Sequence, residues 1–256
     1  MKTDMTGKVA VVTAAAAALG LGTAIKLGEY GAAVLLIDPD AGALEAAVAK
    51  VRATGASAHA HCTDITDADN CARAIAEAKS VFGGIDALCN IATAFYPAPA
   101  AQMSVADWNT TLALNLSAPF FLTQAAIPHL LERNGSVVNI SSCAAIMVQP
   151  YAVAYGTTKA GLNHMTRTLA GEFIDQPIRF NAIVVGSMAM DSGSNVQIPK
   201  DVDVSVFLRT APSRPLITIG ELAEVIAYLA SDASRGFNGA CLSMDNGLSL
   251  GVTSGT

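Results

Sequence analysis

The sequence predicts an α/β fold built on a doubly wound, mostly parallel sheet of seven strands, with helices on both of its faces. Segments with the pattern of strands alternate with segments with the pattern of helices, at spacings that suit β–α–β crossovers. The strand segments are short and continuously apolar, as parallel strands covered on both faces should be. The length of 256 residues suits one large α/β domain. We therefore expect residues 1–256 to form a single domain.

The first half of the chain supplies four of the expected strands. An apolar run at 8–13 is followed by a helical pattern at 19–30, which Gly31 ends. Another helical pattern at 67–82 repeats apolar residues at helical spacing and stops at Gly83 and Gly84. The remaining elements of this half are strands at 32–38, 57–64 and 85–92 and a helix at 41–54.

The second half completes the alternation. A proline-rich loop at 95–100 leads to a long helix at about 105–131, a strand at 135–142, a helix at about 151–173 and a strand at 178–185. An irregular stretch at about 187–215, which we expect to form the substrate loop, precedes a helix at 221–232 and a last strand at 240–245. This order is typical of a Rossmann-type fold, in which ligands bind beyond the carboxyl ends of the strands.

Composition argues against several classes of partner. The net charge is -6 and the basic residues are scattered singly, so we expect no nucleic acid partner. The apolar run between Lys8 and Lys26 resembles a signal peptide, but it is slightly short for a membrane span and is better explained by a strand, a turn and a helix. We therefore expect no membrane partner. The five cysteines are widely spaced and form no metal motif, which favours buried free thiols in a cytoplasmic protein and no metal site.

The turn after the first strand is where such a sheet holds the pyrophosphate of a dinucleotide. It reads TAAAAALG over 13–20, so only Gly20 matches the usual glycines. A sharper signal is Asp38 at the end of the second strand, because a carboxylate there accepts hydrogen bonds from both adenine-ribose hydroxyls and repels a 2′-phosphate. The turn also lacks the basic residues that would bind such a phosphate. These features favour NAD over NADP, although Asp38 could instead be a solvated residue or a cap before Pro39.

The segment from Ser142 to Lys159 carries the chemistry. Tyr155 and Lys159 lie four residues apart on a predicted helix, so they share a face. An ammonium group beside the phenol would lower the pKa of Tyr155, which would make it a usable acid and base at a carbonyl oxygen. Ser142 ends a predicted strand at the same edge of the sheet, where its hydroxyl can hold the substrate oxygen.

Taken in order, these residues resemble the classical short-chain dehydrogenase/reductase family over nearly the whole chain. The matching positions are Thr13, Gly20, Asp38, Asp64, Ile65, Asn90, Ala92, Asn115, Ser142, Tyr155, Lys159, Gly186 and the closing GACLSMDNG. The resemblance implies an NAD(H)-dependent oxidoreductase that interconverts a secondary alcohol and a ketone on a small molecule. The catalytic residues it implies are Asn115, Ser142, Tyr155 and Lys159. It also implies a homotetramer or a homodimer.

The resemblance implies further roles around the cofactor. Lys159 would also hold the nicotinamide ribose, and Asn115 would anchor a water in a proton relay. Asp64 would contact the adenine amine, while Asn90 and Ala92 would line the adenosine and ribose. The plainer alternatives are that Asn115 bonds to backbone and that Asp64 only starts a turn. The full set of expected cofactor contacts is Thr13, Leu19, Gly20, Asp38, Asp64, Ile65, Asn90, Ala92, Tyr155, Lys159, Gly186 and Met188.

The chain also departs from the family pattern. Ala14 and Ala18 replace two glycines of the turn, and an alanine with φ > 0 would be strained by about 1–2 kcal/mol. Thr93 stands where the family's NNAG motif ends in glycine, and Ile91 replaces the second asparagine of that motif. Two further departures are Val185 in place of a proline and Met190 at a common threonine position.

These departures keep other functions open. One alternative is a catalytically weak or silent family member retained for binding or regulation. Another is a 3-oxoacyl thioester reductase, an activity commonly linked to NADPH, which Asp38 opposes; an enoyl reductase has a different tyrosine–lysine spacing. The largely apolar residues expected to wall the pocket favour an apolar, alicyclic substrate, and they are Phe95, Tyr96, Ile146, Met147, Val148, Gln149, Tyr151, Met188, Met190, Val206 and Phe207.

Overall fold

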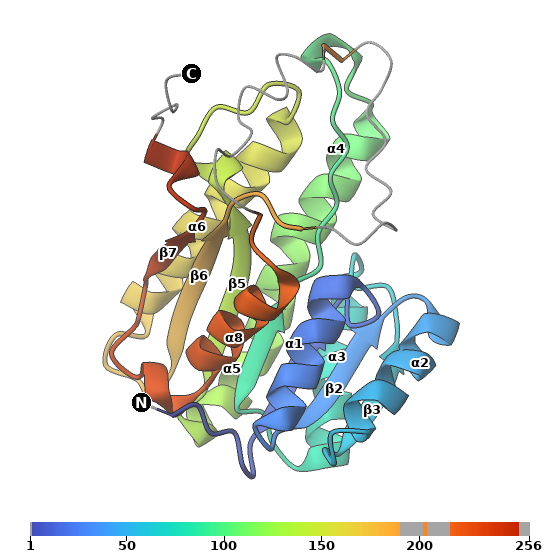
Figure 1. Ribbon diagram of the computed structural model, residues 1–256, viewed down its shortest axis with the longest axis vertical. Coiled ribbons are helices and arrows are strands. Elements are labelled where there is room, and N and C mark those ends of the chain that lie inside the picture. Colours follow the sequence, from blue (N-terminus) through green and yellow to red (C-terminus); the bar gives the residue numbers. More distant parts are fainter. Residues whose placement is uncertain (1, 190–201, 204–215, 251–256) are drawn as a thin grey trace.

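A computed structural model describes residues 2–189, 202–203 and 216–250 of the protein. Its centre is one seven-stranded sheet with the strand order β3-β2-β1-β4-β5-β6-β7 (Figure 1). Every neighbouring pair is parallel. The order reverses between β1 and β4, and the carboxyl ends of the strands diverge there to leave room for a ligand. The predicted fold class is confirmed.

The observed elements lie within a few residues of those predicted. The strands are β1 Val9–Thr13, β2 Ala33–Asp38, β3 Ala58–Cys62, β4 Ala87–Asn90, β5 Ser136–Ser142, β6 Arg179–Val185 and β7 Cys241–Met244. The α-helices of the described residues are α1 Ala18–Glu29, α2 Ala41–Arg52, α3 Ala68–Phe82, α4 Val105–Leu112, α5 Ala118–Arg133, α6 Val153–Glu172 and α8 Ile219–Ala230.

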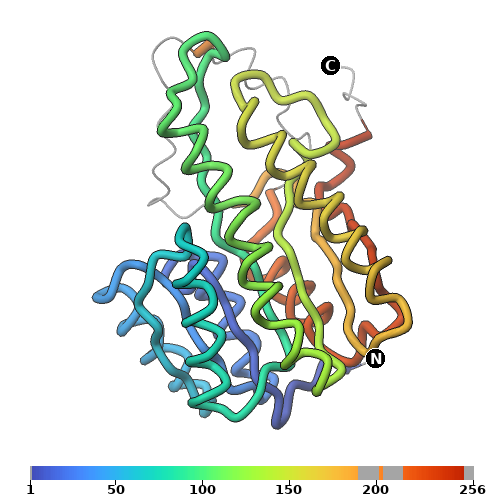
Figure 2. The backbone as a smooth tube through the Cα atoms, turned by 180° about the vertical axis from the view of Figure 1, so that it is seen from behind, coloured from blue at the N-terminus to red at the C-terminus, as the bar shows by residue number. Residues whose placement is uncertain are grey.

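Two apolar clusters fix the helices to opposite faces of the sheet. Helices α1, α2 and α8 pack on one face, where Leu27, Val48 and Ile226 are buried. Helices α3, α5 and α6 cover the other face, where Ile75 and Leu122 are buried (Figures 1 and 2). Burial of apolar side chains on both faces explains why the strands are continuously apolar rather than alternating.

The turn after β1 contains one strained alanine. Ala14 has φ 51°, in the left-handed region, whereas Ala18 begins α1 and is not among the residues with positive φ. Gly20 is required beside it, because a Cβ at that position would lie 2.0 Å from the carbonyl oxygen of Ala14. The strain anticipated for the two alanines therefore falls on Ala14 alone.

The long helix predicted at about 105–131 is interrupted. A π-helical segment, Ala113–Ser117, joins α4 to α5 and contains Asn115. The wider turn lets the Asn115 side chain bond to the backbone of the loop after β4, and Pro119 follows as an early residue of α5.

The two ends of the expected substrate loop meet beside the sheet. Met188 pairs with Ile217 in an isolated parallel bridge, and the Ala189 N–H donates to the Ile217 carbonyl at 2.8 Å. Residues 190–201 and 204–215 lie outside the described residues, and with them Met190, Val206 and Phe207. Of the segment between them, the structure describes Val202, which is buried, and Asp203, whose N–H donates to the Tyr151 hydroxyl.

Replacing Ala14 by glycine should stabilise the protein. Glycine relieves the left-handed strain of about 1–2 kcal/mol but loses more backbone entropy on folding, so the expected net gain in the free energy of unfolding is about 0.5–1 kcal/mol. Urea unfolding of A14G and wild type measures it. The matched variant A18G, which places glycine in a helix, should be destabilised by up to about 1 kcal/mol. A loss of stability in A14G would contradict the assigned strain.

Candidate active site

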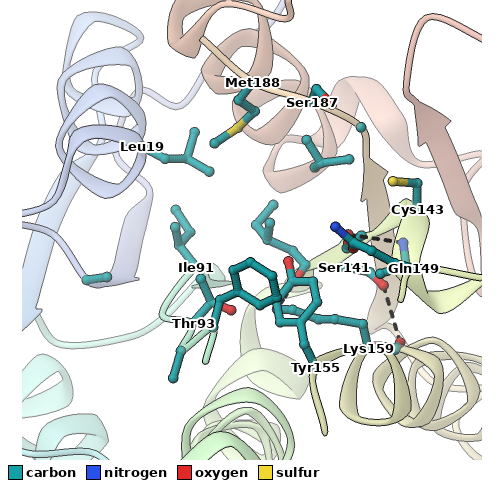
Figure 3. A pocket seen from close by; sticks show the side chains of 18 of the residues that line it. Leu19, Ile91, Thr93, Ser141, Cys143, Gln149, Tyr155, Lys159, Ser187 and Met188 are labelled. Atoms are coloured by element: carbon teal, nitrogen blue, oxygen red, sulfur yellow. Dashed lines mark hydrogen bonds between the residues drawn. The ribbon is translucent and has the colours of Figure 1, made fainter. Parts of the chain in front are cut away.

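A cavity of about 740 Å³ opens at the carboxyl ends of the strands (Figure 3). Its wall runs from the turn after β1, through the loop after β4, to the end of β5, helix α6 and the chain beyond β6. The lining residues on the cofactor side include Ala14, Ala17, Leu19, Gly20, Gly186, Ser187 and Met188. Those on the chemical side include Ile91, Thr93, Phe95, Tyr96, Leu114, Ile140, Ser142, Cys143, Met147, Gln149, Tyr155, Lys159 and Leu248. One cavity therefore joins the predicted dinucleotide turn to the predicted catalytic residues.

Ser142 and Tyr155 both face this cavity. Ser142 ends β5, and its Oγ accepts a hydrogen bond from the Ala144 N–H at 3.2 Å. Tyr155 lies in the first turn of α6, and its ring packs against Phe95 with 4.8 Å between the ring centres. A substrate oxygen between the two hydroxyls could be held by one and exchange a proton with the other.

Lys159 lies one turn farther along α6 and is 1% exposed. Its Nζ donates a hydrogen bond to the Ile140 carbonyl at 2.8 Å and lies 5.6 Å from the centre of the Tyr155 ring. Burial lowers the pKa of Lys159 from its usual value near 10.5 to about 7. The amine therefore changes charge near neutral pH, which suits a group that takes part in proton exchange.

The expected lowering of the Tyr155 pKa by Lys159 is wrong for this structure. Burial raises the pKa of Tyr155 above its usual value, and hydrogen bonds from Ser142 and Thr93 only partly oppose that rise. Lys159 does not counter it because its amine bonds to Ile140 and its own burial disfavours the charged form. The Lys159 amine lies near the Tyr155 ring as predicted, but it does not lower the pKa of Tyr155.

Asn115 is fully buried and does not line the cavity. Its Oδ1 accepts from the Ala94 N–H at 2.7 Å, and its Nδ2 donates to the Ala94 carbonyl at 2.9 Å and to Thr158 Oγ1 at 3.3 Å. The plainer reading, that Asn115 bonds to backbone, thus describes its contacts. These bonds tie the loop after β4 to α6, so Asn115 holds two walls of the cavity together, and a role in a water relay stays a prediction.

The cofactor end fits a nicotinamide dinucleotide. Gly20 and Gly186 line the cavity, and neither position has room for a side chain, since a Cβ would lie 2.0 Å from the Ala14 carbonyl oxygen or 2.7 Å from the Asp245 Cα, respectively. Of the expected cofactor contacts, the cavity brings together Leu19, Gly20, Tyr155, Lys159, Gly186 and Met188. Ala14, which stands where the family has glycine, also lines this space.

Asp38 is 9% exposed and held at the end of β2. Its two oxygens accept hydrogen bonds from the Ala16 and Asp40 N–H groups, each at 3.1 Å. The carboxylate is therefore fixed against the alanine-rich turn, outside the residues that line the cavity, and each oxygen keeps a free lone pair for a further donor.

The other expected cofactor contacts lie outside the cavity. Thr13 is buried, and its Oγ1 accepts from the Ile91 and Ala92 N–H groups at 2.9 and 3.0 Å, so it joins β1 to the loop after β4. Asp64 is exposed and accepts from both the Thr66 N–H and the Thr66 hydroxyl, which makes it the start of a turn in this structure. Of the remaining three, Ile65 and Asn90 are buried and Ala92 is half-buried.

A buried polar chain beneath the site escaped the sequence prediction. Asn90 donates to Asn139 at 2.8 Å, and Asn139 donates to Thr166 at 2.9 Å, which links β4, β5 and α6. The available signal was the single asparagine inside the otherwise apolar run VVNI of β5. Leu248 and Ser187 were also missed as lining residues, because the turn that returns the chain end to the cavity has no pattern in the sequence.

The predicted pocket wall is partly correct. Phe95, Tyr96, Met147, Gln149 and Met188 line the cavity. Two predictions are wrong because the side chains turn to solvent: Ile146 is 58% and Val148 is 86% exposed.

The prediction that Tyr151 lines the cavity is also wrong. It has φ 65° and its hydroxyl accepts from the Asp203 N–H at 3.4 Å. The strained backbone at this bulky residue lies just before α6.

All five cysteines are free. Only Cys71 and Cys89 are buried and Cys62 is exposed, so the expectation that every thiol is buried is wrong. In the part of the chain that the structure describes, no group of three or more His, Cys, Asp or Glu side chains could hold a metal ion. No helix in that part is long and apolar enough to cross a bilayer.

Comparisons with known proteins agree with this geometry. A family model described as enoyl-(acyl carrier protein) reductase matches residues 14–249. The chain is 34% identical to 2,5-dichloro-2,5-cyclohexadiene-1,4-diol dehydrogenase LinX of Sphingobium indicum, over 98% of this chain and 100% of that protein. It is 35% identical to cis-4-hydroxycyclohexanecarboxylate dehydrogenase of Sinomonas cyclohexanicum, over 94% of this chain and 96% of that protein.

Solved structures show the same relationship. A putative short-chain alcohol dehydrogenase from Sinorhizobium meliloti has a TM-score of 0.88 at 32% identity, covering 98% of this chain and 99% of its own. An NAD⁺-bound xylitol dehydrogenase has a TM-score of 0.85 at 30% identity, and the match covers 95% of this chain and 99% of that chain. The chain is therefore an oxidoreductase that acts on alcohol and carbonyl groups, and it belongs to the classical short-chain dehydrogenase/reductase family.

Proposed function

We propose that the protein is an NAD(H)-dependent dehydrogenase that interconverts a secondary alcohol and a ketone on a largely apolar, alicyclic small molecule. The observation that carries the proposal is the single cavity lined by both the dinucleotide turn and the pair Ser142 and Tyr155. In this proposal residues 1–256 act as one domain, and the segment at about 187–215 borders the substrate.

The residues have separate roles in alcohol oxidation. The nicotinamide, when bound, accepts the hydride from the carbinol carbon. Ser142 donates a hydrogen bond to the substrate oxygen and fixes its position. Tyr155 Oη takes the proton from that oxygen as the hydride leaves, and returns a proton to the carbonyl oxygen in the reverse direction. Lys159 holds the nicotinamide ribose and exchanges the proton onward near neutral pH, as its pKa of about 7 allows.

The cavity supports an apolar substrate. Most of its chemical side is hydrocarbon, thioether or aromatic, as in Phe95, Leu114 and Met147, and no arginine lines it among the described residues. Two relatives are named for the oxidation of hydroxyl groups on six-membered carbon rings. Both observations support a secondary alcohol on a ring.

NAD is the proposed cofactor rather than NADP. The carboxylate of Asp38 is fixed beside the turn, where it would repel a 2′-phosphate. A structural neighbour is a xylitol dehydrogenase with NAD⁺ bound. The 3-oxoacyl thioester reductase alternative has support in a relative named 3-oxoacyl-[acyl-carrier-protein] reductase FabG of Thermotoga maritima, which is 32% identical to this chain, but that activity is commonly NADPH-linked.

The assembly and location proposed are a homotetramer in the cytoplasm. The family resemblance supports a tetramer, with a homodimer as the smaller form. Five free cysteines support a reducing compartment. No partner other than the small-molecule substrate is proposed.

The direct test is reduction of NAD by a panel of alicyclic alcohols and diols, with the variant Y155F. Removal of the phenolic oxygen should lower kcat by about 10²–10⁴-fold, because the proton then has no acceptor at that position. Tyr228→Phe removes a hydroxyl from a tyrosine on α8 that packs on Phe237, and should leave kcat unchanged.

Two results would count against the dehydrogenase. Wild-type kcat retained in Y155F would exclude Tyr155 as the acid/base. Absence of NAD and NADH binding by calorimetry at millimolar cofactor would favour the catalytically silent alternative instead.

Cofactor preference should depend on Asp38. Wild type should use NAD with a higher kcat/KM than NADP, and D38N should reduce that preference by about 10–100-fold, since it loses a charge that favours the ribose and opposes the phosphate. The matched variant D40N changes the cap of α2 at the same loop and should keep the wild-type preference. Faster turnover with NADPH than with NADH in wild type would overturn the assignment and favour the thioester reductase.

The burial of Lys159 should make the free energy of unfolding depend on pH. The pKa of Lys159 is about 7 in the folded protein and near 10.5 in the unfolded chain, so between these pH values the unfolded chain binds one proton more at this amine. The free energy of unfolding therefore rises with pH over this range, and Lys159 destabilises the fold most below pH 7. The gain in unfolding free energy of K159M over wild type should therefore shrink from pH 7 to pH 10, by at most about 1.4 kcal/mol per pH unit. Denaturant unfolding across pH measures it.

Lys50→Met is the control, because Lys50 is an exposed residue on α2. It measures how much of any change comes from removing a lysine at an exposed position. A K159M difference that does not change between pH 7 and pH 10 would show that the Lys159 amine is charged in the fold at neutral pH.

A further inference from the structure

The segment after β5 places an amide inside the cavity and leaves apolar side chains in solvent. Met147 and Gln149 line the cavity. Their neighbours Ile146 and Val148 are 58% and 86% exposed. Burial of apolar surface alone would favour the opposite arrangement, with the isoleucine and valine inside and the glutamine in water. Packing therefore does not explain why the side chain of Gln149 lines the cavity, and a functional reason is called for.

The backbone on both sides of Gln149 is held by hydrogen bonds. Before it, the Met147 N–H donates to the Cys143 carbonyl at 2.8 Å. After it, the Ala152 N–H donates to the Gln149 carbonyl at 3.3 Å. Figure 3 shows the Gln149 side chain directed into the cavity that Tyr155 also lines. The backbone thus sets the position of this amide.

The amide of Gln149 has no hydrogen-bond partner in the part of the chain that the structure describes. Nearby polar groups of the cavity wall are already bonded within the protein. The Ser141 hydroxyl donates to the Lys159 carbonyl at 3.3 Å, and the Lys159 amine donates to a carbonyl of β5 at 2.8 Å. The Thr93 hydroxyl donates to Asn115 Oδ1 at 3.2 Å. Gln149 therefore offers the cavity an N–H₂ group and a carbonyl oxygen that are both free to bind a ligand.

The chemistry of the cavity points to an uncharged oxygen as the partner of this amide. An amide is neutral and can donate to a carbonyl oxygen or accept from a hydroxyl. A carboxylate ligand would require a cation, but no arginine lines the cavity among the described residues, and the Lys159 amine is bonded to β5. Tyr96 also brings a hydroxyl to the wall, but it is 44% exposed, so water can satisfy it.

We propose that Gln149 is a specificity-determining residue that binds a second, non-reacting oxygen of the substrate, so that ring diols and the hydroxyketones formed from them are preferred over monohydric alcohols. The inference rests on the proposed function, in which Ser142 and Tyr155 hold the reacting oxygen. With that oxygen fixed, a hydrogen bond from Gln149 to another oxygen determines how the ring lies in the cavity. Because the second oxygen does not react, the bond contributes equally to binding of substrate and transition state, and its loss raises KM more than it lowers kcat.

The test compares the isomeric cyclohexanediols with cyclohexanol as substrates of wild type and Q149M. Methionine keeps the unbranched shape of glutamine but has no amide. Wild type should have a higher kcat/KM for at least one diol than for cyclohexanol, after correction for the second reactive hydroxyl of the diol. Q149M should lower this ratio by about 3–10-fold, mainly through the KM of the diol, as the loss of one neutral hydrogen bond implies.

Gln176→Met is the matched control. Gln176 is exposed in the connection between α6 and β6, at the edge of the sheet opposite the cavity, so this variant should keep the wild-type ratio. Q149E is the second variant, and it also serves if Q149M folds poorly. Its carboxylate accepts hydrogen bonds but cannot donate them, so it should keep the preference for a diol and lose affinity for the hydroxyketone product.

The proposal is overturned if wild type prefers cyclohexanol to every diol, or if Q149M keeps the wild-type ratio. If wild type oxidises no alcohol at all, the proposed function fails, and ligand-observed NMR of diol binding to wild type and Q149M then decides the role of Gln149. Binding that is weaker in Q149M by the same factor supports that role. Equal binding, or no binding to wild type, contradicts it.

Discussion

The active site depends on one buried amine. Lys159 is almost completely enclosed, and its Nζ is held by a hydrogen bond to the Ile140 carbonyl in β5. That bond joins α6, which carries Tyr155, to β5, which ends in Ser142. The burial that holds the amine also brings its pKa to about 7, at a cost to stability that a purely structural residue would not require.

The rest of the site follows from the sheet. Because all seven strands are parallel, their carboxyl ends meet at one edge, and polar residues far apart in sequence are brought to one cavity. Two polar links hold the walls in place beneath it. Thr13 joins β1 to the loop after β4, and Asn115 joins that loop to α6. Neither residue faces the cavity, yet both determine its width.

Much of this fold could be predicted from the sequence, because strands covered on both faces are continuously apolar and glycines end several helices. The positions of Ser142, Tyr155 and Lys159 followed from the strand and helix that carry them. The contacts of individual side chains could not be predicted, since they depend on the packing of distant elements. Asn115 lies in a π-helical turn inside a segment that the sequence pattern predicts as one continuous helix. Val148 follows β5, but its side chain is exposed to solvent instead of lining the cavity.

Electrostatic effects were the least predictable part. Spacing placed Lys159 beside Tyr155, but the charge of the amine depends on burial that no sequence pattern reveals. Likewise an alanine-rich turn does not show which alanine takes the left-handed conformation, and the structure assigns it to Ala14. Ala14 lines the cavity, so the affinity for NAD is the property in which this chain should differ most from relatives with glycine there.

A crystal structure with NADH bound would show whether this cavity places a nicotinamide next to Tyr155. We expect the nicotinamide ring in the cavity, with its reactive C4 facing the space between Tyr155 Oη and Ser142 Oγ, and the adenine ribose on Asp38. A complex with the nicotinamide turned away from Tyr155, or with the cofactor elsewhere on the protein, would contradict it.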